Sequence, residues 1–140
     1  MDTREKIRSL EEFVAGDTSF AWTVVLGMFD PLTVEVTRYI ASLASAGRML
    51  LVVVSDTVER RDRGQGSVAC LSAEARARML AALRVVDAVV VAPLSAAKDA
   101  LQRSRIDLHI EEDPGADQRR SEQFIQYVLD RQASAVTQET

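Results

Sequence analysis

The residues best placed to do chemistry follow a short apolar run, Thr23–Leu26. Gly27 breaks the run, and Asp30-Pro31 forms a turn that disfavours helix before about Thr33. A junction between a buried strand and a helix is where an open parallel sheet usually binds its ligand, often through a phosphate. A structural interpretation fits equally: glycine makes the turn, Phe29 packs and the aspartate caps the helix.

Charged stretches are weaker candidates. Arg60, Arg61 and Arg63 lie in the polar stretch 57–69, where they either bind an anion or pair with neighbouring acids in solvent. Glu111–Asp113 follow a predicted strand, but consecutive acids lack the spacing of a hard-cation site. We therefore expect no metal site.

Other reactive side chains are expected to be structural. His109 is the only histidine and lies in a short predicted strand, which favours a satisfied, partly buried role. Cys70 is the only cysteine, so no intrachain disulfide can form, and no basic partner marks it as a nucleophile. Arg76 and Asp87 are predicted to be structural or to lie at the rim of the site.

Buried strands and amphipathic helices alternate along the chain. Strands are predicted at Thr23–Leu26, Met49–Val54, Val85–Val91 and Ile106–Ile110, and helices at Leu10–Val14, Thr33–Ala46, Ala73–Leu83, a segment capped by Ser95 and ending near Arg103, and Gln118–Arg131. This order predicts an α/β fold, a Rossmann-like doubly wound parallel sheet with helices on both faces. Residues 1–132 are interpreted as one domain and residues 133–140 as a frayed tail.

Composition limits the classes of partner. The net charge is −4 and the arginines are scattered among acids, which argues against nucleic acid or an anionic membrane surface. The charged N-terminus lacks the apolar region of a signal peptide, and no apolar run is long enough to span a membrane. We expect a cytoplasmic protein.

Two motifs resemble one enzyme family. Gly27-Met28-Phe29-Asp30-Pro31-Leu32 is similar to the start of the cytidylyltransferase-like nucleotidyltransferases. Residues 76–90, RARMLAALRVVDAVV, resemble the pattern of the adenylyltransferase domain of ADP-heptose synthase, a heptose-phosphate adenylyltransferase. The resemblance covers about Lys6 to Ile110 and implies the family's Rossmann-like fold.

The family's phosphate-binding positions are changed here. Its His-x-Gly-His motif corresponds to Thr33-Val34-Glu35-Val36, so both histidines are replaced and a carboxylate stands at the glycine position. Its lysine in a glycine-rich loop corresponds to Arg63, the following arginine to Ser67, and a second lysine to Glu111. Removing one such donor typically costs about 3–4 kcal/mol of transition-state stabilisation. No catalytic residue is therefore intact.

The resemblance implies a vestigial nucleotide pocket. Its residues would be Gly27, Met28, Phe29, Asp30, Thr33, Glu35, Val36, Arg63, Arg76 and Glu111. The first hypothesis is a non-catalytic binding or interaction module, with a homodimer, another protein or a small molecule as partner. The second is an active transferase that moves AMP or CMP from ATP or CTP, with Mg²⁺, to a sugar phosphate or similar compound. In it Thr33, Arg60, Arg61 or Arg63 would replace the lost donors. A third is a pocket for a neutral or cationic ligand, because its mouth has become acidic.

Overall fold

The computed structural model describes residues 2–16, 19–30, 32–56, 59–60, 67–68, 71–111 and 125–134. Its helices are the 3₁₀ turn η1 (Thr3–Lys6) and the α-helices α1 (Leu10–Val14), α2 (Val34–Ser42), α3 (Ala73–Ala81) and α4 (Leu94–Arg103). Its strands are β1 (Ile7–Arg8), β2 (Ala21–Gly27), β3 (Arg48–Ser55), β4 (Glu59–Arg60), β5 (Ser67–Val68), β6 (Ala88–Ala92) and β7 (Asp107–Glu111). A further helix occupies residues 125–134.

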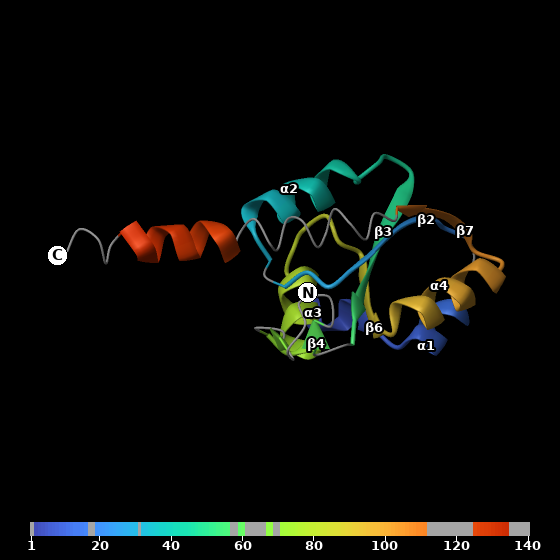
Figure 1. Cartoon of the computed structure of the whole chain (residues 1–140). Helices are drawn as coiled ribbons and strands as arrows, with labels where there is room; N and C mark the ends of the chain where they lie inside the picture. Colours follow the sequence, from blue (N-terminus) through green and yellow to red (C-terminus); the bar gives the residue numbers. More distant parts are fainter. Residues whose placement is uncertain are drawn as a thin grey trace.

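Five parallel strands form the main sheet, in the order β1-β6-β3-β2-β7 (Figure 1). Strand β3 is its centre, between β6 and β2, and every residue of β2 is in register with a residue of β3, from Ala21 opposite Arg48 to Gly27 opposite Val54. Their continuous apolar sequence is typical of strands covered on both faces. The predicted Rossmann-like parallel α/β sheet is confirmed.

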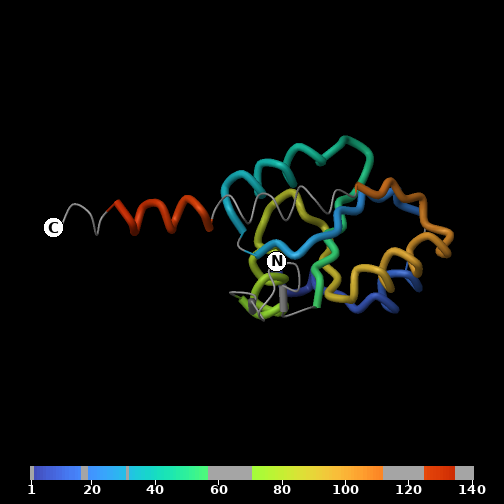
Figure 2. Tube along the Cα trace, viewed as in Figure 1, coloured from blue at the N-terminus to red at the C-terminus, as the bar shows by residue number. Residues whose placement is uncertain are grey.

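Each face of the sheet carries its own core. Helices α2 and α3 cover one face, where Ile40 and Leu80 pack on Val52 and its neighbours. Helices α1 and α4 cover the other face, where Phe13 and Leu101 belong to the second core cluster. The chain trace in Figure 2 shows α1 (blue) beside α4 (gold), although they are far apart in the sequence.

Helix starts follow local capping chemistry. The side chains of Ser9, Thr33 and Ser72 accept hydrogen bonds from the backbone amides three residues on, which satisfies donors that a helix start leaves open. The expectation for Ser95 was wrong, because α4 begins at Leu94 and its N-cap is Pro93, which makes no side-chain capping bond.

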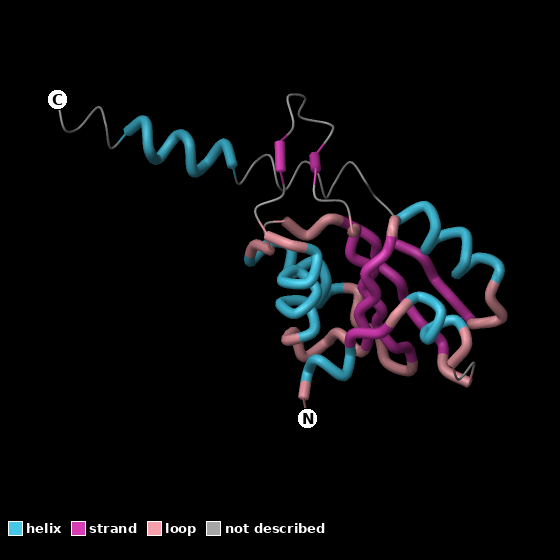
Figure 3. The backbone as a smooth tube through the Cα atoms, turned by 90° about the horizontal axis from the view of Figure 1, so that it is seen from below, coloured by secondary structure: helices cyan, strands magenta, loops and turns pink. Residues whose placement is uncertain are grey.

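Several predicted boundaries move because of tertiary pairing. The strand expected at Val85–Val91 begins only at Ala88, since Asp87 accepts from the amide of Leu50 and donates its own amide to the Leu50 carbonyl just before the ladder. The predicted loop at 57–69 contains the antiparallel β4–β5 pair, which lies beyond the end of the main sheet in Figure 3. The helix expected to reach Ala46 ends at Ser42.

Strand β7 has two unlike faces, as an edge strand commonly does. Leu108 and Ile110 pack into the core beneath α1 and α4. The alternate residues, Asp107, His109 and Glu111, therefore face the side of the sheet that carries α2. His109 was expected to be partly buried, but its side chain is 62% exposed. The expectation was wrong because β7 lies at the edge of the sheet, and the polar residues that alternate along it face the side that stays exposed.

The helix over residues 125–134 extends away from the sheet in Figures 1 and 3. Tyr127 and Leu129 are more than half exposed on it, and the Arg131 guanidinium lies 5.7 Å from the centre of the Tyr127 ring. The beginning of the helix predicted at Gln118–Arg131 and the tail after residue 134 lie outside the described residues.

Candidate functional site

The chain reverses its direction of travel across the sheet between β2 and β7. From β2 it proceeds through α2 to β3 and then to β6, whereas β7 returns to the opposite side of β2. Helix α2 follows β2 on one face, and α4 precedes β7 on the other. The carboxyl ends of β2 and β7 therefore border a topological switch point, where open α/β sheets bind ligands.

The predicted turn after β2 lies at this switch point. Phe29 has a φ of 55°, in the left-handed region that non-glycine residues rarely adopt, and its side chain is buried in the core under α2. Asp30 is 1% exposed. Packing by Phe29 was expected, but capping of α2 by Asp30 was not observed, because the cap is Thr33. The turn is thus held in a strained shape by its buried aromatic ring.

Arg76 organises the same end of the sheet from α3. Its Nη1 donates to the Met28 carbonyl at 2.7 Å and to the Ser55 carbonyl at 3.0 Å, and its Nε donates to the Leu71 carbonyl at 3.2 Å. The residue is 1% exposed, so a position at the rim was wrong and a structural role is supported. A single buried guanidinium therefore ties the turn after β2 to the end of β3.

The start of α2 holds the three positions at which the chain departs from the His-x-Gly-His motif that this segment resembles. The Thr33 Oγ1 accepts from the Val36 amide at 3.2 Å, so that amide is already bonded. Val36 is 2% exposed and packs in the core rather than lining an open pocket. Glu35 is exposed in the first turn, where its carboxylate is favoured by the helix dipole and repels other anions.

Glu111 ends β7, and its side chain turns back along this strand toward His109. Its Oε1 lies 2.8 Å from the His109 Nε2, a hydrogen bond that becomes an ion pair when the imidazole is protonated. In the sheet register Glu111 pairs with Val25, two residues before Gly27. The structure thus places Glu111 near the predicted turn along the sheet, but its partner is on its own strand.

Several residues singled out in the sequence, as site candidates or as structural ones, fall wholly or partly outside the described residues. Arg61, Arg63 and Cys70 lie outside the described residues, and Arg60 is described only through its backbone in β4. The anion patch proposed for the arginines therefore stays a prediction. Among the residues that the structure does describe, no three His, Cys, Asp or Glu side chains are grouped so that they could hold a metal ion.

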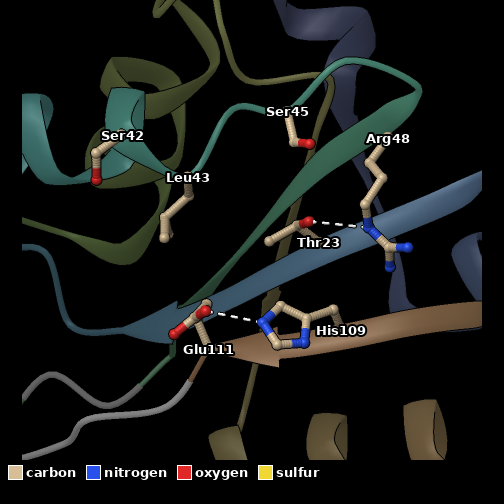
Figure 4. Close-up of a pocket in the computed structure, with 7 residues that line it drawn as sticks. All are labelled: Thr23, Ser42, Leu43, Ser45, Arg48, His109 and Glu111. Atoms are coloured by element: carbon tan, nitrogen blue, oxygen red, sulfur yellow. Dashed lines mark hydrogen bonds and ion pairs between the residues drawn. The ribbon is translucent and has the colours of Figure 1, made fainter.

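The sequence interpretation missed an open cavity of about 380 Å³ between the end of α2 and β7 (Figure 4). The residues that line it are Thr23, Ser42, Leu43, Ser45, Arg48, His109 and Glu111. The polar-apolar alternation of Asp107–Glu111 could have indicated an uncovered face, because a strand buried on both faces carries no such pattern. Nothing in the local sequence indicated that Ser45 and Arg48 would meet that face.

Comparisons leave the chain without an assigned family. Neither the scan of protein-family models nor the search of curated proteins finds a match to it. Within the described part of the chain, no helix has both the length and the apolar character needed to cross a membrane. What is established is a five-stranded parallel α/β sheet of Rossmann-like topology with an organised turn at its switch point.

Proposed function

We propose that this chain is a nucleotidyltransferase-like domain that has lost catalysis and acts as a binding or interaction module. Two independent lines support the proposal. The sequence resembles that family from about Lys6 to Ile110. The five-stranded parallel order and the turn at its switch point are compatible with a fold that binds nucleotides in this crevice.

The observation that carries the loss of catalysis is the start of α2. A helix start binds phosphate through free amides and a favourable dipole. Here the Val36 amide is bonded to Thr33, and Glu35 brings a negative charge to the same turn. The Val36 side chain is apolar and buried in the core, so this position offers no donor to an approaching phosphate.

The alternative is an active adenylyl- or cytidylyltransferase in which other side chains replace the lost phosphate-binding donors. The anchored turn after β2 favours it, because Arg76 holds Met28 in place as a preformed pocket wall would need. The Thr33 hydroxyl hydrogen can still donate while its oxygen accepts from Val36. Mg²⁺ with ATP or CTP and arginines of the stretch 57–69 would supply the remaining charge. This alternative predicts that Arg63→Ala abolishes turnover.

The deciding experiment combines binding with turnover. Mg·ATP and Mg·CTP are titrated calorimetrically into the full chain, and pyrophosphate release is followed with a panel of sugar phosphates. The proposal predicts no pyrophosphate release. Sustained release that is lost in Arg63→Ala would overturn it in favour of the active enzyme.

A matched pair of variants tests the role of Glu35 in nucleotide binding. Glu35→Gln removes the carboxylate in the first turn of α2, and Glu74→Gln removes the equivalent charge in the first turn of α3. We expect Glu35→Gln to strengthen Mg·ATP binding and Glu74→Gln to leave it unchanged. Equal effects would show that the charge at α2 does not exclude phosphate.

A further inference from the structure

The cavity between α2 and β7 lies away from the start of α2, and its walls carry opposite charges. Figure 4 shows Ser42, Leu43 and Ser45 along one side, with Arg48, His109 and Glu111 on the strands opposite. It opens on the uncovered face of β7, whereas Thr33 and Glu35 lie at the other end of α2. A ligand here would not need the phosphate positions that the chain has lost.

Arg48 is a cation held in a fixed orientation. Its Nε donates to the Thr23 hydroxyl at 3.2 Å, and its Nη2 donates to the Trp22 carbonyl at 2.6 Å. Both acceptors are neutral. The Asp107 carboxylate lies 3.8 Å from the Arg48 Nη2, beyond hydrogen-bond distance, and the Asp107 side chain is 70% exposed, so this ion pair is weak. Among the described residues Nη1 has no hydrogen-bond partner, so the guanidinium can still bind an anionic group.

Glu111 supplies the opposite charge. Its Oε1 is bonded to His109, and within the described part of the chain its Oε2 makes no hydrogen bond. The sheet register places His109 beside Thr23, the residue that anchors Arg48. In the view of Figure 4 the Glu111 carboxylate turns toward His109, whose ring is drawn between that carboxylate and the Arg48 guanidinium. The two charged groups line the same cavity at separate places.

The lining selects the kind of occupant. Among the described residues that line it, Leu43 is the only apolar side chain, whereas an amphipathic helix needs a mainly apolar groove. A simple anion would meet Glu111, and a simple cation would meet Arg48. The volume of about 380 Å³ is at the small end of the range for small-molecule sites.

We infer that this cavity binds a small zwitterion of the amino-acid class, with its carboxylate on Arg48 and its ammonium group on Glu111. The hydroxyls of Thr23 and Ser45 border the same space and offer further hydrogen bonds. Because the two charges come from different strands, β3 and β7, a ligand whose charges are several bonds apart fits better than one in which they are adjacent. The site shares Glu111 with the border of the switch point, but its lining includes none of the residues at the start of α2.

The test uses three probes that separate the two charges. 4-Aminobutanoate carries both groups, butanoate only the carboxylate, and butylamine only the ammonium group. Binding to the full chain is followed by backbone amide shifts in two-dimensional NMR. We expect 4-aminobutanoate to shift amides around Thr23, Ser45 and His109, and each single-charge probe to bind at least about tenfold more weakly.

Variants test the two charged groups separately. Arg48→Met should abolish binding of butanoate and of the zwitterion, and Glu111→Gln should abolish binding of butylamine and weaken the zwitterion at least about tenfold. Arg48→Lys keeps the charge without the planar fork, so it serves if Arg48→Met fails to fold. The control Arg78→Met removes an exposed arginine of α3 outside the cavity and should change nothing.

Three results would overturn the inference. The first is an absence of shifts with 4-aminobutanoate at millimolar concentration. The second is binding that survives both Arg48 variants. The third is shifts confined to the turn after β2, which would place the ligand at the switch point and link it to the nucleotide pocket instead.

Discussion

Replacing Arg76 with methionine should destabilise the fold strongly, because three backbone carbonyls lose a buried donor. Those carbonyls belong to Met28, Ser55 and Leu71. A buried acceptor left without a partner costs about 1–3 kcal/mol. The losses are not additive, and removing a buried charge returns part of its desolvation cost, so we expect a net loss of about 3–5 kcal/mol.

The assay is urea unfolding of Arg76→Met beside Arg78→Met. Arg78 is on the same helix, its side chain is 57% exposed, and among the described residues its ion pair is with Glu74, at 2.7 Å. Its loss should change the free energy of unfolding by less than about 0.5 kcal/mol. We expect the midpoint to fall for Arg76→Met with little change in slope, together with faster amide exchange in the turn after β2. A loss below about 1 kcal/mol would show that the guanidinium does not hold the turn.

Three further outcomes follow from named contacts. Val36→His, which introduces the histidine of the motif that this segment resembles, should lower the free energy of unfolding by about 2–4 kcal/mol, because the side chain is buried in the core; wild-type stability would show that this position can open to solvent. Phe13→Ala should lower the free energy of unfolding by about 3–5 kcal/mol. It should also change the fluorescence emission of Trp22, the only tryptophan, because the rings of Phe13 and Trp22 meet edge to face at 4.9 Å. Unchanged emission would argue against that contact. The Arg4 guanidinium, hydrogen-bonded to Asp2, lowers the pKa of that carboxyl, so Arg4→Ala should raise this pKa in an NMR titration, and an unaltered value would contradict the pairing.

The lowered pKa of Asp2 determines how this carboxyl changes folding stability with pH. A carboxyl whose pKa is lowered in the folded state favours folding above its ordinary pKa and loses that contribution as the pH falls through the lowered value. Asp2 and Arg4 are exposed at the N-terminus, so the effect should appear in the titration rather than in the melting temperature. A clear acid-dependent change in melting temperature removed by Arg4→Ala would contradict this.

Charged residues on the polar face of β7 can have a second role, which is to keep this edge of the sheet from pairing with another sheet. Asp107 and Glu111 are charged side chains on an edge strand, and such charges discourage pairing with another sheet. In an antiparallel pair of two copies centred on His109, Asp107 of one copy would lie opposite Glu111 of the other, and like charges directly opposite are destabilising. A homodimer, if formed, should use another surface.

The sequence by itself determined the alternation of strands and helices. Apolar runs such as Met49–Val54 suit only strands covered on both faces, and the capping hydroxyls of Ser9 and Ser72 act within one helical turn. These signals are local, so they can be read without knowing which segments meet. The central strands β2 and β3 accordingly lie within one or two residues of their predicted bounds.

Only the tertiary structure decided which side chains meet and which are buried. Arginine is usually a surface residue, yet Arg76 is enclosed at the ends of β2 and β3. Backbone carbonyls there accept hydrogen bonds from its guanidinium. His109 looked partly buried until β7 was placed at the edge of the sheet. Arg48 and Glu111 are 63 residues apart in sequence numbering and share one cavity. Burial and charge pairing depend on contacts between distant segments, and no local pattern encodes those contacts.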